Sequence, residues 1–300
     1  MIDIGQSGCT VTVSAPAKVN LTLRVIGRRA DGYHDLESVV AAVDLFDRLT
    51  MRPADALVLT CQDAGIPAGD ENLVVKAARL LRDACGVRSG ADIRLKKNIP
   101  AGRGFGGGSS DAAAALAGLN VLWRTGRSAA ELACLGARLG SDVPLFFGPT
   151  ASVMRGRGER IESVAARCGW LMALAWPDHA NPTADVYAAY DRMAPAAARR
   201  PAATEILKHL GGPVRAAGPC LVNDLEPAAR SVRPDGPDLR AIFERAGAPA
   251  VGMTGSGSAY FALADTEAEA LRLAEAARAG GARAAVARIL QQEISKEETP

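Results

Sequence analysis

The chain has little of what several classes of protein depend on. It has three histidines, and its six cysteines lie far apart without a CxxC pair. We therefore expect neither a zinc site built from protein ligands nor a disulfide framework. No apolar run approaches the roughly 18 residues of a membrane span. The N-terminus MIDIGQSGCT also lacks the basic and apolar regions of a signal peptide. We expect a cytoplasmic protein with reduced thiols and no membrane partner.

A dominant charge of one sign is also missing. The chain has 35 Lys and Arg against 33 Asp and Glu, a formal net charge of +2. Because nucleic-acid binding proteins usually carry a basic patch or stripe, no nucleic-acid partner is expected. With 300 residues, 48% of them hydrophobic, the chain can form one large domain or two ordinary ones, each with a full core.

What the chain does have is a glycine-rich loop that leads into a helix. The segment PAGRGFGGGSSD, residues 100–111, holds five glycines and runs into AAAALAGLNVLW. Glycine allows positive φ and close approach of the backbone to a ligand, and a first helical turn offers unpaired N–H groups. The pattern predicts phosphate binding at a helix N-terminus, with Ser109 and Ser110 capping the helix or reaching a phosphate-bound Mg²⁺. The alternative is a flexible surface turn.

This loop differs from the two common nucleotide-binding motifs. No GKS or GKT follows the glycines, so it is not a Walker A motif. The dinucleotide fingerprint needs an acidic residue about twenty positions on, at the end of a second strand, and that pattern is not found either.

Hydrophobic periodicity divides the chain into two regions. In the first, short alternating or β-branched runs predict a mainly antiparallel sheet. Its expected strands are 9–13, 18–27, 36–45, 47–52 and 56–61. A helix capped by Asp70 and ending at Gly86 comes next. Then follow a strand at 91–97, the glycine loop, helices at 109–123 and 128–139, and strands at 150–156 and 159–164.

The second region begins at the apolar run WLMALAW. Its expected order is strand 170–176, helices 182–192, 203–211, 222–230 and 237–246, strands 249–253 and 258–264, helix 266–279 and strand 281–288. This order is typical of an α+β sandwich with a small antiparallel sheet. We therefore expect an ATP-binding domain at 1–165, a substrate-binding domain at 166–290 and a frayed tail at 291–300.

Three separated segments resemble the signature motifs of the GHMP kinases, small-molecule ATP kinases named for galactose, homoserine, mevalonate and phosphomevalonate. They are APAKVNLTL at 15–23, PAGRGFGGGSSDAAAAL at 100–116 and MTGSGSAYFAL at 253–263. RRADGYHDLESV at 28–39 and LGSDVPLFF at 139–147 resemble the members whose substrate is a cytidylyl sugar alcohol. The likeness extends over nearly the whole chain in the same order.

The resemblance implies a two-domain α+β architecture. Its N-terminal domain is like domain 2 of ribosomal protein S5, and its C-terminal domain is ferredoxin-like. ATP, with Mg²⁺ on its phosphates, and a small-molecule substrate would meet between the domains of a monomer or homodimer. The implied ATP-binding residues are Pro100, Ala101, Gly102, Arg103, Gly104, Phe105, Gly106, Gly107, Gly108, Ser109 and Ser110. Arg103 replaces a small residue of the usual loop and Phe105 replaces a Leu, which puts local nucleotide contacts in question.

Two residues are implied to be catalytic. Asp142 matches the aspartate that accepts the proton of the substrate hydroxyl, although Asp followed two residues later by Pro144 also suits a helix N-cap. Lys18 lies in a predicted strand and shares a face with Asn20, so an exposed strand lysine is the alternative. By resemblance Lys18 lies against Asp142, keeps it ionised and stabilises the developing alkoxide.

The implied substrate-binding residues come from several segments. Tyr33, His34 and Tyr187 would hold a cytosine by stacking and by reading the base edge. From the residues alone, the first two could cover a sheet edge and the third could be core packing. The other implied contacts are Asn20, Asp142, Thr183, Thr254, Gly255, Ser256 and Gly257. A plain β-turn is the alternative for the last four.

Two other functions remain open. The chain could be another GHMP kinase, for homoserine or mevalonate, but these substrates carry no base for Tyr33 and His34 to bind. It could instead be a non-catalytic nucleotide-binding regulator, which the presence of both Lys18 and Asp142 disfavours. RNA binding through an S5-like domain is disfavoured by the near-neutral charge.

Overall fold

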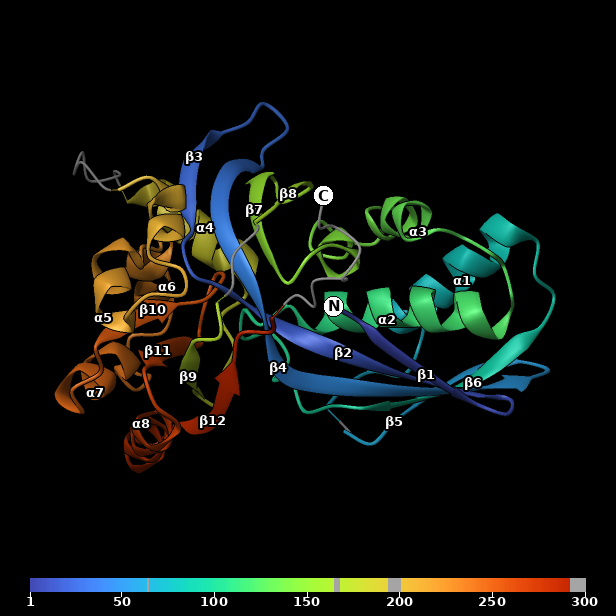
Figure 1. Ribbon diagram of the computed structural model, residues 1–300. Coiled ribbons are helices and arrows are strands. Elements are labelled where there is room, and N and C mark those ends of the chain that lie inside the picture. The colour runs from blue at the N-terminus through green and yellow to red at the C-terminus, as the bar shows by residue number, and fades with distance from the viewer. Residues whose placement is uncertain (64, 165–167, 194–200, 292–300) are drawn as a thin grey trace, which may run out of the picture.

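The computed structural model describes residues 1–63, 65–164, 168–193 and 201–291, which form two sheets with helices packed on them (Figure 1). The large sheet contains β1 (Asp3–Ser7), β2 (Thr10–Asn20), β3 (Arg24–Arg28), β4 (His34–Ala54), β5 (Leu57–Cys61), β6 (Gly90–Lys96), β7 (Ala151–Gly156) and β8 (Arg160–Ser163). All of its strand pairs are antiparallel except β5 with β6. Helices α1 (Leu73–Cys85), α2 (Gly107–Leu122) and α3 (Ala129–Gly136) belong to the same part of the molecule.

Strand β4 organises the large sheet. It is 21 residues long and pairs with β2, β3, β6 and β7. The separate strands predicted at 36–45 and 47–52 were therefore wrong. The register between β2 and β4 shifts at Pro16/Ala17, so β4 carries extra residues at a bulge and bends without ending. Pro16, which has no N–H to donate, stands at this irregularity.

Two helix starts differ from the predictions. The N-cap of α1 is Asn72, whose side chain accepts a hydrogen bond from the Val74 N–H at 2.9 Å, whereas Asp70, two residues earlier, is paired with Arg79. Helix α2 begins at Gly107, after the left-handed residue Gly106, and it has no side-chain cap, so neither Ser109 nor Ser110 caps it. The predicted end of α1 at Gly86 is confirmed, with φ of 63°.

The second part contains a small antiparallel sheet with the order β10-β11-β9-β12. Its elements are β9 (Leu171–Trp176), α4 (Thr183–Arg192), η2 (Ala203–Lys208), α5 (Val214–Ala217), η3 (Gly218–Cys220), α6 (Glu226–Val232), α7 (Leu239–Arg245), β10 (Ala250–Met253), β11 (Tyr260–Ala264), α8 (Glu267–Ala279) and β12 (Arg283–Arg288). The predicted α+β class is confirmed. The helix predicted at 203–211 is a shorter 3₁₀ turn, η2.

Alternate residues of β9 pack into two different hydrophobic clusters. Ala173 and Ala175 pack with α8 and its neighbours, whereas Met172 and Leu174 pack with large-sheet residues such as Val19. The cluster that contains Met172 and Leu174 therefore spans both parts, and Figure 1 shows β4 reaching from one part to the other. Among the described residues, no helix combines the length and hydrophobicity needed to cross a bilayer.

The predicted domain junction at 165/166 lies in residues 165–167, outside the described ranges. Residues 292–300 of the predicted tail, and 194–200 of the connection before η2, also lie outside them. The domain boundaries therefore remain a prediction.

Candidate active site

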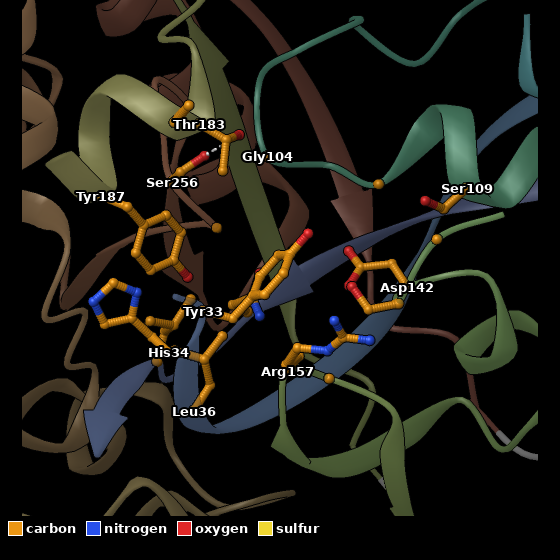
Figure 2. A pocket seen from close by; sticks show the side chains of 18 of the residues that line it. Tyr33, His34, Leu36, Gly104, Ser109, Asp142, Arg157, Thr183, Tyr187 and Ser256 are labelled. Atoms are coloured by element: carbon orange, nitrogen blue, oxygen red, sulfur yellow. Dashed lines mark hydrogen bonds between the residues drawn. The ribbon is translucent and has the colours of Figure 1, made fainter. Parts of the chain in front are cut away.

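A cleft of about 1140 Å³ lies where the two parts meet. This volume is above the range of about 300–1,000 Å³ typical of a site for one drug-sized ligand. The cleft is lined by thirteen of the residues predicted from the sequence: Lys18, Asn20, Tyr33, His34, Gly102, Gly104, Gly106, Ser109, Asp142, Thr183, Tyr187, Gly255 and Ser256. Figure 2 shows many of these side chains.

Lys18 and Asp142 form an ion pair inside this cleft. Lys18 Nζ lies 3.7 Å from Asp142 Oδ2 and 2.5 Å from Asn20 Oδ1. Burial lowers the pKa of Lys18, an effect that the Asp142 carboxylate opposes. Asp142 does not cap η1 (Pro144–Phe147), whose N-cap is Val143, and Lys18 is buried. Both local alternatives, the N-cap and the exposed strand lysine, are therefore excluded.

The glycine loop, residues 100–110, passes close to this pair. Gly102, Gly104 and Gly106 have φ of 68°, 87° and 70°, in the left-handed region that favours glycine. A Cβ on Gly104 would lie 2.3 Å from the Thr254 carbonyl oxygen, and one on Gly106 would lie 2.9 Å from Lys18 Cγ. The N–H groups in the first turn of α2 have no partner within the helix, as at any helix start, and no side chain caps them, so an anion could accept hydrogen bonds from them.

Several loop residues do not line the cleft with their side chains. Phe105 is fully buried and packs edge-on against Trp176, so only its backbone could meet a nucleotide. The Arg103 guanidinium donates to three backbone carbonyls. Ser110 Oγ is buried with no partner among the described residues, whereas Ser109 faces the cleft. The others that are absent from the cleft wall are Pro100, Ala101, Gly107 and Gly108.

His34 and Tyr187 form an aromatic platform at the other end of the cleft (Figure 2). Their rings stack with centroids 4.9 Å apart and an interplanar angle of 24°. His34 Nε2 lies 2.8 Å from Asp191 Oδ1 of α4. Burial, with a smaller effect of the Asp142 charge, raises the pKa of Tyr187 to about 12, so its hydroxyl is neutral. Because the rings touch, a base cannot enter between them and could stack only on an outer face.

Tyr33 and Arg157 lie between this platform and Asp142 in the view of Figure 2. Tyr33 is 59% exposed, and the Arg157 guanidinium carbon is 4.7 Å from its ring centroid, a cation–π contact. Arg157 lies in the β7–β8 turn and lines the cleft, and its guanidinium forms no ion pair within the described residues. Sequence reasoning missed Arg157 and Asp191. Only the glycines on either side of Arg157, in RGRGER, marked the turn.

Thr254 holds the three motif segments together. It is fully buried, and its hydroxyl accepts from the Asn20 N–H at 3.0 Å and donates to the Gly104 carbonyl at 3.2 Å. Thr254 and Gly257 do not line the cleft, contrary to the expected direct contact. Ser256 does line it, with its Oγ 3.0 Å from Thr183 Oγ1.

A glycine loop at a helix N-terminus, next to a lysine–carboxylate pair in a cleft between two α+β parts, is the arrangement of a small-molecule kinase. Residues 72–149 match the family described as "GHMP kinases N terminal domain", and residues 203–283 match "GHMP kinases C terminal". The chain belongs to the GHMP kinase family, whose members transfer phosphoryl groups from ATP.

Two curated relatives and one crystal structure indicate which kinases of this family the chain resembles. A 4-diphosphocytidyl-2-C-methyl-D-erythritol kinase of Pelotomaculum thermopropionicum is 44% identical over 261 residues, 86% of this chain and 90% of the relative. The enzyme of that name from Exiguobacterium sibiricum is 38% identical, over 88% of this chain and 92% of the relative. A crystal structure of 4-(cytidine 5'-diphospho)-2C-methyl-D-erythritol kinase is 38% identical with a TM-score of 0.79, covering 94% of this chain and all of that one (100%).

Other kinases share the fold at much lower identity. A homoserine kinase from Cytophaga hutchinsonii has a TM-score of 0.70 at 19% identity, over 96% of this chain and 98% of its own. This likeness concerns the fold alone. The two-domain GHMP kinase fold expected from the sequence is confirmed.

Proposed function

We propose that this chain transfers the γ-phosphoryl group of ATP to the 2-hydroxyl of 4-diphosphocytidyl-2-C-methyl-D-erythritol. The products are the 2-phosphate and ADP, and the reaction belongs to the non-mevalonate route to isoprenoid precursors. The observation that carries the proposal is the Lys18–Asp142 pair, 3.7 Å apart beside the glycine loop. The similarity to kinases of that substrate, at 38–44% identity over most of both chains, supports the choice of acceptor.

In the proposed reaction the acceptor oxygen attacks the γ-phosphorus and the bond from that phosphorus to the β–γ bridging oxygen breaks. The hydroxyl proton passes to an oxygen of Asp142. Lys18 offsets the negative charge that develops on the attacking oxygen. Asn20 holds Lys18 in place through its Oδ1, and its Nδ2 donates to Ser38 Oγ at 2.8 Å. The two ligands would therefore meet at the Lys18–Asp142 pair.

The donor phosphates would bind to the backbone of the glycine loop and to the first turn of α2. The positive φ of Gly102, Gly104 and Gly106 turns the chain tightly there, and no Cβ blocks the approach. The described residues contain no cluster of three or more His, Cys, Asp or Glu side chains suited to a metal. Mg²⁺ bound with the nucleotide would neutralise charge on the phosphates, and Ser109 is the hydroxyl that could help to hold it.

The acceptor would extend from the aromatic platform to Asp142. We assign cytosine to the outer face of the platform or to Tyr33, and the methylerythritol hydroxyls to Asn20 and Asp142. Thr183, Gly255 and Ser256 would contact the acceptor from the second part, while Thr254 and Gly257 act by holding the loop. The diphosphate joins base to polyol and must cross the space between. Arg157, which forms no ion pair in the described residues, would neutralise it there.

We further propose a cytoplasmic monomer or homodimer, as expected from the sequence and its family resemblance. An assay that couples ADP release to a colour change tests the function. It would use purified protein with ATP and, separately, the cytidylyl methylerythritol, mevalonate and homoserine. We expect turnover of the first acceptor alone. Turnover of mevalonate or homoserine would favour another GHMP kinase, and ATP binding without any turnover would favour a regulator.

A further inference from the structure

The side chain of Arg103 joins the glycine loop to the second part of the molecule. Its Nε donates to the Pro177 carbonyl at 3.1 Å, and one terminal nitrogen donates to the Asp178 carbonyl. The other terminal nitrogen donates to the Ala101 carbonyl, within the loop, at 3.0 Å. The planar guanidinium therefore connects both sides of the interface at once.

Backbone contacts strengthen the same interface. The Ala259 N–H donates to the Arg103 carbonyl at 3.3 Å. Gly102 and Gly104, on either side of Arg103, line the cleft, whereas Arg103 does not. The loop thus presents glycine backbone to the nucleotide side and its only long polar side chain to the second part.

The segment that Arg103 contacts leads directly to the acceptor side of the cleft. Pro177 and Asp178 follow β9 and precede α4, which carries Thr183 and Tyr187. Ala180, in the same connection, would lie 3.2 Å from a Cβ on Gly102. A displacement of this connection would therefore move both the loop and the start of α4.

We propose that Arg103 is a positioning residue that holds the glycine loop against the β9–α4 connection, so that the nucleotide site is formed before ATP binds and is coupled to the acceptor site. The proposal rests on the proposed kinase function. Arg103 acts through the loop backbone and not by touching phosphate, so its effect depends on the shape of the guanidinium as well as on its charge.

The test compares Arg103→Ala, Arg103→Lys and the control Arg283→Ala. Arg283, in β12, donates from its Nε to the Asp178 carboxylate at 2.8 Å, so the control removes an arginine contact to the same connection without touching the loop. Steady-state kinetics should give a KM for ATP raised ~10-fold in Arg103→Ala, as expected for lost hydrogen bonds to a charged group. The KM for the acceptor at saturating ATP should rise by less than the KM for ATP, kcat should change by less than about threefold, and Arg283→Ala should match the wild type. One ammonium cannot reproduce the planar three-carbonyl contact, so Arg103→Lys should resemble Arg103→Ala.

Calorimetric titration with ADP, which needs no turnover, is the second measurement. We expect weaker ADP binding in both Arg103 variants and a smaller effect of the acceptor on ADP affinity. An unchanged ADP affinity and KM for ATP in Arg103→Ala would overturn the proposal. Full rescue by Arg103→Lys would also overturn it, because a direct charge contact with phosphate would then explain the loss. If the wild type binds ADP but phosphorylates none of the three acceptors, the proposed function fails while the ADP titrations still test the role of Arg103.

Discussion

The ammonium of Lys18 lies 3.7 Å from a carboxylate oxygen of Asp142, and the two side chains differ in exposure, at 6% and 32%. Lys18, in β2, lies against Gly106 of the glycine loop and donates to Asn20, whereas Asp142 opens to the cleft. The lysine is thus held by the protein and the carboxylate is accessible to an acceptor. This asymmetry suits a fixed charge next to a proton acceptor.

Removing either charge should abolish most turnover. We expect Asp142→Asn and Lys18→Ala each to lower kcat by ~100-fold or more, because proton acceptance and charge stabilisation each contribute at least that factor. Steady-state kinetics on purified protein measure the effect, and thermal unfolding with ADP titration checks that each variant is folded. Near-normal turnover in a folded Asp142→Asn protein would refute its assignment as the base.

The loss of activity at high pH should reflect deprotonation of Lys18. Its pKa is lowered from the ordinary value of 10.5, mainly by burial. Because the charged form is the active one, activity should fall as the pH rises through this lowered pKa, below the usual range of lysine. In Lys18→Arg the group stays charged, so any remaining activity should persist to higher pH. An identical alkaline limb in both proteins would assign it to another group.

Tyr187 should affect the acceptor more than the nucleotide. Tyr187→Ala removes one ring of the aromatic platform and should raise the KM for the cytidylyl acceptor by ~10-fold or more, the scale of base stacking on an aromatic residue. The KM for ATP should stay nearly constant, and Tyr187→Phe, which keeps the ring, serves as the control. Equal changes in both KM values would argue against stacking.

Arg157 should recognise the diphosphate of the acceptor. Arg157→Ala should weaken competitive inhibition by cytidine diphosphate ~10-fold, because a charge-assisted contact is lost, and leave inhibition by cytidine unchanged. Arg160→Ala, an exposed arginine in the adjacent strand β8, is the control. Equal loss of inhibition by the nucleoside would indicate that Arg157 acts by supporting the Tyr33 ring.

A buried cluster of three charged side chains, Lys97, Asp47 and Asp111, should make the free energy of unfolding depend on pH. Lys97 contacts both Asp47 and Asp111, at 2.7 Å from the latter. Burial raises the pKa of Asp111 from 3.8 to about 7. The negative charge of Asp47 adds to this increase, and the positive charge of Lys97 opposes it. The folded state therefore binds an extra proton between about pH 4 and 7. The stabilisation from Asp111 is full below its unfolded pKa and is lost as the pH rises to about 7.

Asp111→Asn, which is neutral at every pH, should remove this dependence. Urea unfolding of both proteins at pH 5 and pH 8 measures it. We expect the free energy of unfolding of the wild type to fall more than that of Asp111→Asn between these values. A parallel change in both proteins would place the extra proton on another group.

Local patterns predicted much of the fold because local physics determines it. Gly86 ends α1, and α2 begins within the run of glycines, directly after the left-handed Gly106, since left-handed residues and helix propensity act within a few positions. The continuity of β4 was missed because its bulge is set by pairing with β2. Asn72 rather than Asp70 caps α1 because the helix begins directly after it, at Leu73, and Asp70 pairs instead with Arg79.

The site residues likewise divide into those that sequence motifs identify and those that only the tertiary structure places. Lys18, Asp142 and the glycine loop could be identified from motifs, whereas Arg157 and Asp191 stand in segments with no motif. Thr254 was expected at the substrate, but its hydroxyl binds Asn20 and Gly104, residues far from it in sequence. Phe105 was expected at ATP, but it is buried against Trp176.

The amino-acid sequence by itself determined the α+β class, the loop that can bind phosphate and the family to which the chain is related, because these depend on composition and short-range pattern. Only the tertiary structure decided which side chains face the cleft and which hold it together. Those roles depend on long-range packing between β2, the glycine loop and the β9–α4 connection, and no local segment contains that information.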